Sequence, residues 1–263
     1  MSVDGVGLNA PVALVTMEIR HPAGPLSESS REELKRLLIH DLPIEREAQE
    51  MSWAMGAGGN PTPTAERFHR LVNRDNTLAA SMKTQTVAIE TTAYTNFASW
   101  VDAVMQVVDA RAQVSPIVGV ERIGLRYLLE VRGPAGADGR VDWSHTVAEP
   151  LLGPQGVAPG GLPLADWQGA AVYREAQPGK SMIVRYGTGT GQALDPKYHL
   201  RRTIAAQPGP FFLLDIDSFW TPIAAIPEYN RDEVLGTFRA LYEPARAVAH
   251  EMLIGRPDEL LRS

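Results

Sequence analysis

The chain has 263 residues, of which 25 are basic and 31 are acidic, and its formal net charge is −6 at pH 7. Apolar residues make up 44% and charged residues 21%, a balance that excludes a disordered or fibrous chain and suffices for a large core. The absence of cysteine excludes disulfides, thiol nucleophiles and cysteine-ligated metal centres. The acidic balance argues against avid, sequence-independent nucleic-acid binding, but not against a local basic patch.

Targeting signals are not evident in the sequence. The segment from Met1 to Pro11 has neither a basic region nor an apolar core of the kind a signal peptide carries. No apolar run approaches the roughly 18 residues that a membrane helix needs. We therefore expect a cytoplasmic protein that does not enter a membrane.

The first half of the chain alternates between strand and helix patterns. Alternating apolar residues predict a strand from Pro11 to Arg20. Further expected elements are a helix from Ser30 to His40 capped by Ser30, a loop from Ala57 to Pro63, a hairpin of Phe68–Asn73 and Leu78–Lys83, and a strand from Thr84 to Thr91. Thr95 or Asn96 can cap a helix whose apolar stripe continues to about Gln113.

The second half repeats this alternation. A long strand is expected from Val118 to Arg132, followed by a linker from Gly133 to Gly139 and a loop from Leu151 to Pro163. Strands are expected at Ala170–Glu175, Ser181–Tyr186 and Phe211–Asp217. The closing helix begins after its cap Asn230, contains Pro244 and ends before Gly255.

Strands joined by short turns predict a mostly antiparallel sheet or sheets, and two long helices would pack on one face. The fold class is therefore α+β. The element order suggests an N-terminal half of residues 8–132 and a C-terminal half of residues 140–263 with similar plans. Two similar halves and one compact domain are both open alternatives.

A family resemblance rests on the strand Arg122-Ile123-Gly124-Leu125-Arg126-Tyr127, on Leu214-Asp215-Ile216-Asp217 and on the long closing helix. These features resemble a sporadically distributed family of uncharacterised bacterial proteins of similar length. That family has an asparagine where this chain has Leu129. The resemblance implies no activity or cofactor, but the patchy distribution of the family suggests accessory genes such as defence or toxin–antitoxin loci.

Asp215 and Asp217 are the candidate metal ligands. Side chains two residues apart on a strand share a face, so the two carboxylates could hold Mg²⁺ for phosphoryl transfer. The alternative, which we favour, is that they end a core strand.

Arg122 and Arg126 share one strand face about 13 Å apart, at ~3.3 Å per residue. They could follow an extended anionic ligand, or form structural ion pairs with different carboxylates. We favour the ion pairs.

The only dense basic run is Lys197-Tyr198-His199-Leu200-Arg201-Arg202. Basic residues next to an aromatic can bind a nucleic-acid backbone and stack a base, so Lys197, His199, Arg201 and Arg202 are candidate ligand-binding residues. A solvated loop is the alternative.

Other motifs are incomplete. The run from Gly187 to Gly191 lacks the spacing of a phosphate-binding loop and is interpreted as a flexible turn. No histidine pair has zinc-protease spacing, and no serine lies in a G-x-S-x-G motif.

Three functions compete. We favour a non-enzymatic binding or regulatory protein that acts on another protein, with no cofactor and with self-association left open. The second hypothesis is an RNA-binding protein or ribonuclease, and the third is a magnesium-dependent enzyme that uses Asp215 and Asp217.

Overall fold

The computed structural model of the chain describes residues 12–55, 61–136, 139–154, 157, 159–162, 164–175, 179–195, 200–203 and 208–254. Its strands are β1 (Val12–Arg20), β2 (Ile44–Met55), β3 (Pro61–Val72), β4 (Leu78–Met82), β5 (Thr86–Thr91), β6 (Arg122–Val131), β7 (Gln168–Arg174), β8 (Lys180–Gly191) and β9 (Gly209–Trp220). Its helices are α1 (Glu28–Leu38), α2 (Phe97–Val114) and α3 (Arg231–Met252), and the short 3₁₀ helices η1 (Trp143–His145), η2 (Glu149–Leu151) and η3 (Pro159–Gly161) lie between β6 and β7.

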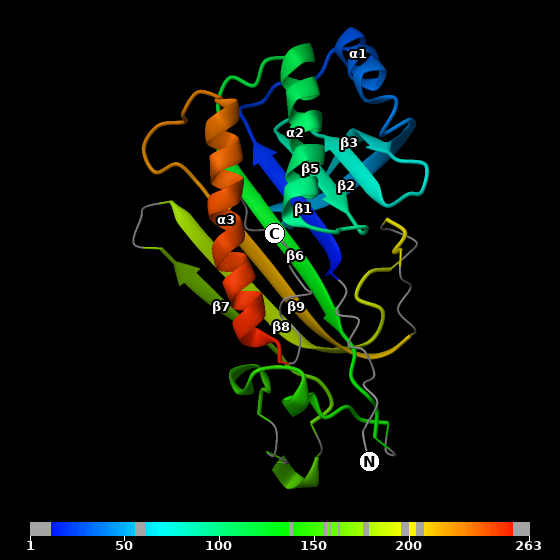
Figure 1. Cartoon of the computed structure of the whole chain (residues 1–263), viewed down its shortest axis with the longest axis vertical. Helices are drawn as coiled ribbons and strands as arrows, with labels where there is room; N and C mark the ends of the chain where they lie inside the picture. Colours follow the sequence, from blue (N-terminus) through cyan, green and yellow to red (C-terminus); the bar gives the residue numbers. More distant parts are fainter. Residues whose placement is uncertain are drawn as a thin grey trace.

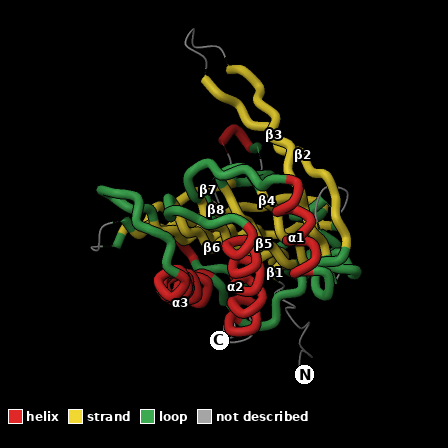
Figure 2. Tube along the Cα trace, turned by 90° about the horizontal axis from the view of Figure 1, so that it is seen from above, coloured by secondary structure: helices red, strands yellow, loops and turns green. Residues whose placement is uncertain are grey.

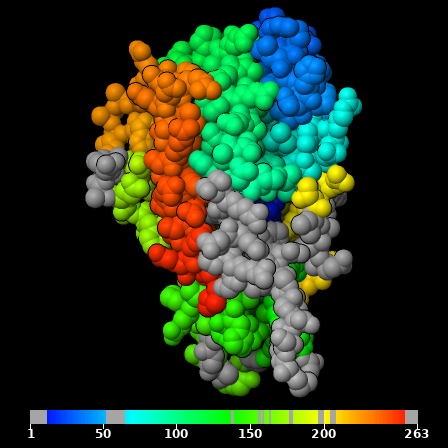
Figure 3. Space-filling view, viewed as in Figure 1, coloured from blue at the N-terminus to red at the C-terminus, as the bar shows by residue number. Residues whose placement is uncertain are grey.

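All nine strands form one sheet in the order β2-β3-β4-β5-β1-β6-β9-β8-β7. Every pairing is antiparallel. The two long helices, α2 and α3, pack side by side on one face of this sheet, with α1 beside α2 (Figures 1 and 3). The α+β class predicted from the sequence is confirmed.

The sheet has the same plan on both sides of its centre. β1 and β6 are the first strands of the two halves and pair with each other in the middle. After β1 the chain crosses to one edge of the sheet, at β2, and returns strand by strand until β5 pairs with β1. After β6 it crosses to the other edge, at β7, and returns until β9 pairs with β6. A long helix follows each return. The sheet is continuous between the two halves and shows no boundary between two domains. The division into residues 8–132 and 140–263 therefore stays a prediction.

The core lies between the sheet and the helices. Alternate residues of the central strands face it, among them Met17, Tyr127 and Ile216, which are fully buried. Phe97 at the start of α2 stacks on Tyr242 of α3, with ring centroids 4.0 Å apart. Burying a large apolar side chain contributes about 1.5–3 kcal/mol, so this layer is the main source of stability.

The helix α1 begins earlier than the sequence pattern predicts. Its N-cap is Ser27, whose backbone is extended and whose side chain accepts a hydrogen bond from the backbone N–H of Ser30. Ser30 lies inside the first turn, and its hydroxyl donates to the carbonyl of Val114. Both serines can cap a helix, so residue type alone could not separate them.

The strand β2 and the start of β3 are absent from the sequence prediction. The predicted loop from Ala57 to Pro63 ends inside β3, which begins at Pro61; residues 56–60 lie outside the described residues. β4 pairs only with the last four residues of β3, from His69 to Val72. Ala48–Met55 and Pro61–Phe68 therefore pair only with each other, and we call them the arm. The arm extends beyond the rest of the sheet, on the side away from α2 and α3 (Figure 2).

The glycine-rich run from Gly187 to Gly191 is not a turn. It is the second part of β8 and pairs with the start of β9. A Cβ atom at Gly187 would overlap the backbone at Trp167, and one at Gly189 would overlap the ring of Phe211. Gly187 and Gly189 are therefore explained by close packing of neighbouring groups on a strand.

Candidate binding face of the sheet

The face of the sheet opposite the helices, which we call the outer face, carries most of the candidate residues. One row of residues in register across all nine strands shows its character: Arg174, Ser181, Phe219, Gly124, Glu18, Ala88, Ser81, Arg70 and Arg46. Neighbouring strands are ~4.8 Å apart, so this row is about 38 Å long. The length suits an extended partner.

Arg122 lies at the centre of the outer face. It donates to Glu18 at 2.8 Å and to Asp217 at 3.0 Å, and its guanidinium lies 4.7 Å from the ring centroid of Phe219. The guanidinium occupies the space above Gly124, where a Cβ atom would overlap it. The missing side chain at Gly124 thus lets one arginine reach two carboxylates.

Arg126 forms a separate cluster on the next row. Its Nε and Nη2 donate to the two carboxylate oxygens of Asp215 at 2.7 and 2.8 Å. Arg185 approaches the same carboxylate from β8 at 3.6 Å. The hydrogen bond to Asp215 raises the pKa of Arg126, and burial opposes that shift. The two predicted arginines therefore bind different carboxylates, which is the favoured alternative of the sequence analysis.

The charges on the outer face lie in two layers. The Asp215 and Asp217 side chains are 5% and 20% exposed, whereas those of Arg20, Arg126 and Arg185 are 53%, 47% and 50% exposed. The carboxylates thus lie at the floor, and the guanidinium groups project into solvent. A partner that approaches this face meets positive charge, although the whole chain is acidic.

The segment between β8 and β9 crosses one end of the outer face and is anchored by Glu130. This carboxylate is fully buried and accepts hydrogen bonds from Arg132, from Arg202 at 2.6 Å and from the backbone N–H of Ala193 at 3.0 Å. Leu194 and Leu200 of the same segment are buried against the sheet.

The basic run at residues 197–202 is only partly described. Arg202 is shielded by its ion pair with Glu130, and Arg201 donates from Nε to the carbonyl of Asp75 at 3.0 Å. Lys197 and His199 lie outside the described residues. Arg202 therefore holds the segment in place, while a ligand-binding role for Lys197, His199 and Arg201 stays a prediction.

Asp215 and Asp217 share the outer face, as expected for alternate strand residues. Both carboxylates already accept hydrogen bonds from arginine, so a cation would have to displace Arg126 and Arg122. Among the described residues, no group of three or more histidine or acidic side chains is arranged to hold a metal ion.

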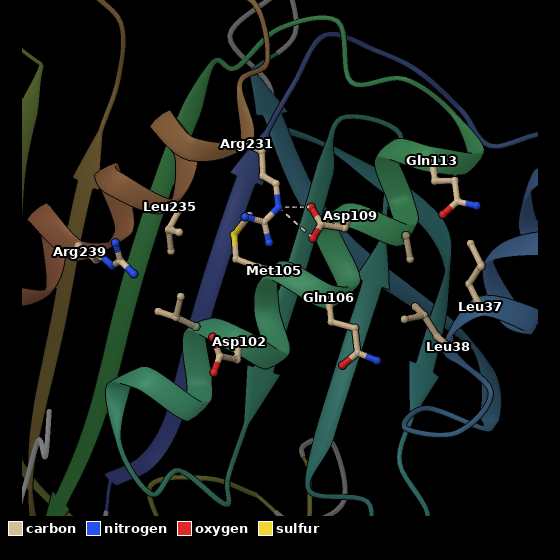
Figure 4. A pocket seen from close by; sticks show the side chains of 12 residues that line it. Leu37, Leu38, Asp102, Met105, Gln106, Asp109, Gln113, Arg231, Leu235 and Arg239 are labelled. Carbon is tan, nitrogen blue, oxygen red and sulfur yellow. Dashed lines mark hydrogen bonds and ion pairs between the residues drawn. The ribbon is translucent and has the colours of Figure 1, made fainter.

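Two cavities lie away from the outer face. One of about 540 Å³ is a groove across α2 between α1 and α3, lined by Leu37, Met105 and Leu235 and crossed by the ion pair of Arg231 with Asp109 at 2.8 Å (Figure 4). The other, of about 1050 Å³, lies between the loops that precede β7 and the strand ends where β8 finishes and β9 begins.

Sequence reasoning missed several members of the outer face. Glu18, Arg185 and Glu130 received no role, although Glu18 and Glu130 alternate with apolar residues on predicted strands, which is the available signal. Their partners could not be assigned without the strand order. The chain matches no protein-family model and no curated protein sequence. Within the described part of the chain, no helix is both long and apolar enough to cross a bilayer.

Proposed function

We propose that this protein is a non-enzymatic binding or regulatory protein that receives another protein on the outer face of its sheet. The observation that carries the proposal is the layering of charge there, with shielded carboxylates below and half-exposed arginines above. Each carboxylate on the floor holds an arginine in place, which gives a fixed pattern of positive groups. Such a pattern favours electrostatic complementarity with an acidic surface.

The test uses two arginines whose loss leaves no carboxylate unpaired. In Arg20→Gln with Arg185→Gln, Glu18 keeps Arg122 and Asp215 keeps Arg126. Tagged native protein, this double variant and a control with Arg36→Gln and Arg239→Gln would be purified from the native host. The proteins they retain would be quantified by mass spectrometry.

We expect a partner that the native chain and the control retain and that the outer-face variant loses at least tenfold. Equal retention by all three proteins would refute the assignment of the face. Catalytic turnover that is abolished by Asp215→Ala would refute the non-enzymatic assignment.

On the family resemblance alone, we further propose an accessory role in a bacterial defence or toxin–antitoxin system, in the cytoplasm. The test is the identity of the neighbouring genes. A toxin, a nuclease or a nucleotide-signalling enzyme encoded next to this chain supports the role, and housekeeping neighbours in every genome that carries it would contradict it.

The exposed arginines also favour a second candidate, binding of single-stranded RNA. Release of counterions from a single strand lowers log K linearly with log salt, with a slope of about −0.7 per neutralised phosphate. Binding of a labelled oligonucleotide at two salt concentrations tests this candidate. Affinity that is independent of salt, or unchanged in Arg20→Gln with Arg185→Gln, would exclude it.

The magnesium hypothesis has less support, since Asp215 and Asp217 are held by arginines. A binder of Mg²⁺ is stabilised by it in proportion to RT ln(1 + [L]/Kd). No rise in the melting temperature with millimolar Mg²⁺ would count against this alternative.

A further inference from the structure

A small cavity lies where the arm separates from the rest of the sheet. The pairing of β3 with β4 ends at His69 and Met82, and the next residues of the two strands diverge. The space between them, of about 140 Å³, is closed by the chain that leads into α1. Its lining consists of Pro25, Leu26, Arg31, Arg67, Phe68, His69, Met82, Lys83 and Thr84.

The titratable side chains that line this cavity are basic or imidazole groups. Arg31 comes from α1, Arg67 and His69 from β3, and Lys83 from the turn after β4. Glu45 and Glu50 bind His69 and Lys83, but neither of them lines the cavity. Three elements of the chain thus bring positive groups or hydrogen-bond donors to one small space.

The two arginines have no carboxylate partner among the described residues. Arg31 contacts Nε2 of His69, and its own Nε is buried without a hydrogen-bond partner. Arg67 is exposed and forms no hydrogen bond or ion pair with any described residue. On the same helix as Arg31, Lys35 and Arg36 both pair with glutamates. Arg31 and Arg67 therefore bring positive charge that no described carboxylate pairs with, whereas Glu45, Glu50 and Glu66 hold the lining residues His69, Lys83 and Thr84.

His69 holds Arg31 in position. Its Nδ1 donates to Glu45 at 2.9 Å, so its Nε2 is the acceptor for the Arg31 guanidinium. Glu45 is fixed in turn by Lys35 at 2.9 Å. This chain of contacts joins α1 to the base of the arm and fixes one guanidinium before a ligand arrives.

We propose that this cavity binds a compact oxyanion, either a phosphate monoester group or a carboxylate, between Arg31, Arg67 and Lys83. Its volume is below the roughly 300–1,000 Å³ of sites for drug-sized ligands, so it suits a single small group. Arginine offers planar, paired donors that match phosphate and carboxylate oxygens, and lysine adds a point charge.

The test is calorimetric titration of the full chain with inorganic phosphate, methyl phosphate and acetate at constant ionic strength. The decisive variant is Arg67→Gln, because the substitution leaves no partner unpaired among the residues that the structure describes. The matched control is Arg46→Gln. Arg46 lies near the base of the arm and is exposed. By strand alternation its side chain lies on the outer face, whereas that of Arg67 lies on the other face of the sheet.

We expect one anion class to bind equally well to the native chain and to Arg46→Gln. It should bind at least tenfold more weakly to Arg67→Gln, because a tenfold change in affinity corresponds to the loss of one charge-assisted hydrogen bond. Preference for phosphates or for acetate identifies the source of the oxyanion. Absence of binding by all three anions up to 10 mM, or equal affinity in Arg67→Gln and the native chain, would overturn the proposal.

Discussion

At the scale of single residues, the position of the Arg122 guanidinium depends on Gly124, because a glycine has no side chain to occupy that space. Gly124 leaves the space that the guanidinium fills, and Glu18 and Asp217 accept its hydrogen bonds. A glycine inside a strand is otherwise unfavourable by roughly 0.5–1 kcal/mol relative to alanine. The ion pairs of Arg122 offset this cost, so the two positions should be energetically coupled.

Gly124→Ala tests that coupling. In the native chain we expect the new methyl group to displace the guanidinium and reduce the free energy of unfolding by about 1 kcal/mol, the net value of a typical hydrogen bond. In an Arg122→Gln background, the same change should stabilise the chain by roughly 0.5–1 kcal/mol, because the new methyl group then displaces no guanidinium and alanine is favoured over glycine inside a strand. Urea denaturation of the four proteins measures the cycle. Additive effects would show that the two residues are independent.

Gly236 provides the matched control for Gly124. It lies inside α3, and a Cβ atom there would meet nothing within 4 Å. Gly236→Ala should therefore stabilise the chain by about 0.4–1 kcal/mol, mainly by restricting the unfolded state. A loss of stability would mean that this helix position has a contact that the structure does not show.

His21 predicts a pH dependence of stability. It is buried, and Nδ1 contacts the carbonyl of Pro22 at 2.8 Å. Burial lowers its pKa below 6.5, which the hydrogen bond to Pro22 opposes, and Arg111 lowers it further. The unfolded chain thus binds the proton more readily, so the contribution of His21 to stability is complete above about pH 6.5 and is lost as the pH falls below it.

We expect the free energy of unfolding to fall by up to about 1.4 kcal/mol per pH unit through this residue as the pH is lowered below 6.5. His21→Asn, which keeps a donor for the Pro22 carbonyl, should flatten that dependence. His145→Asn should not, because the His145 side chain is 85% exposed. Urea denaturation at pH 7.5 and 5.5 makes the comparison, and an unchanged slope in His21→Asn would contradict it.

Glu130 anchors the segment between β8 and β9, and its removal should be costly. Glu130→Gln leaves Arg132 and Arg202 without their buried counter-charge, for which a loss of about 3–5 kcal/mol is typical. Hydrogen exchange should accelerate at residues 192–195 and 200–203. The control Glu33→Gln removes an exposed, solvent-screened pair and should leave the free energy of unfolding nearly unchanged. Equal losses in the two variants would contradict the anchoring role.

At the scale of elements, sequence periodicity predicts the helices and strands that pack on the core, and it misses the elements that do not. α2 and α3 were predicted close to their observed positions, because each buries an apolar stripe. β2 carries Glu45, Arg46, Glu47 and Glu50 and is an edge strand, so its sequence lacks the alternation of a half-buried strand. Charged edge strands reduce unwanted pairing, and the same charges remove the pattern by which strands are recognised.

The arm should be dispensable for folding. Glu50 and Glu66 are register partners, so replacing residues 51–65 with Asn-Gly gives a two-residue hairpin and keeps both glutamates. We expect the melting temperature to change by less than about 4 °C, which corresponds to roughly 1 kcal/mol in a chain of this size. Differential scanning calorimetry tests this. A fall of 10 °C or more would show that the arm packs on the rest of the molecule.

At the scale of the whole molecule, the sequence predicted the class of the fold but not the neighbours in the sheet. Arg122, Arg126, Asp215 and Asp217 were each identified, and their sharing of one face follows from strand alternation. That Asp217 lies beside Arg126 in register while its carboxylate binds Arg122 depends on the pairing of β6 with β9. Those strands are far apart in sequence, and no local pattern specifies their register. The cavity beside Arg67 likewise needs three separate segments of the chain to meet.

The continuity of the sheet predicts that the two halves fold together. β6 pairs with β9 along nine residues, from Ile123 opposite Trp220 to Val131 opposite Phe212, and α3 packs on both strands. Cutting the chain between residues 132 and 140 would expose this seam, including the buried Leu129 and Leu214. We expect one calorimetric transition for the intact chain, and segments 1–132 and 140–263 that are unfolded alone but reassemble when co-expressed. A separate cooperative transition from either isolated segment would contradict this, because that segment would then have a core complete without the β6–β9 seam.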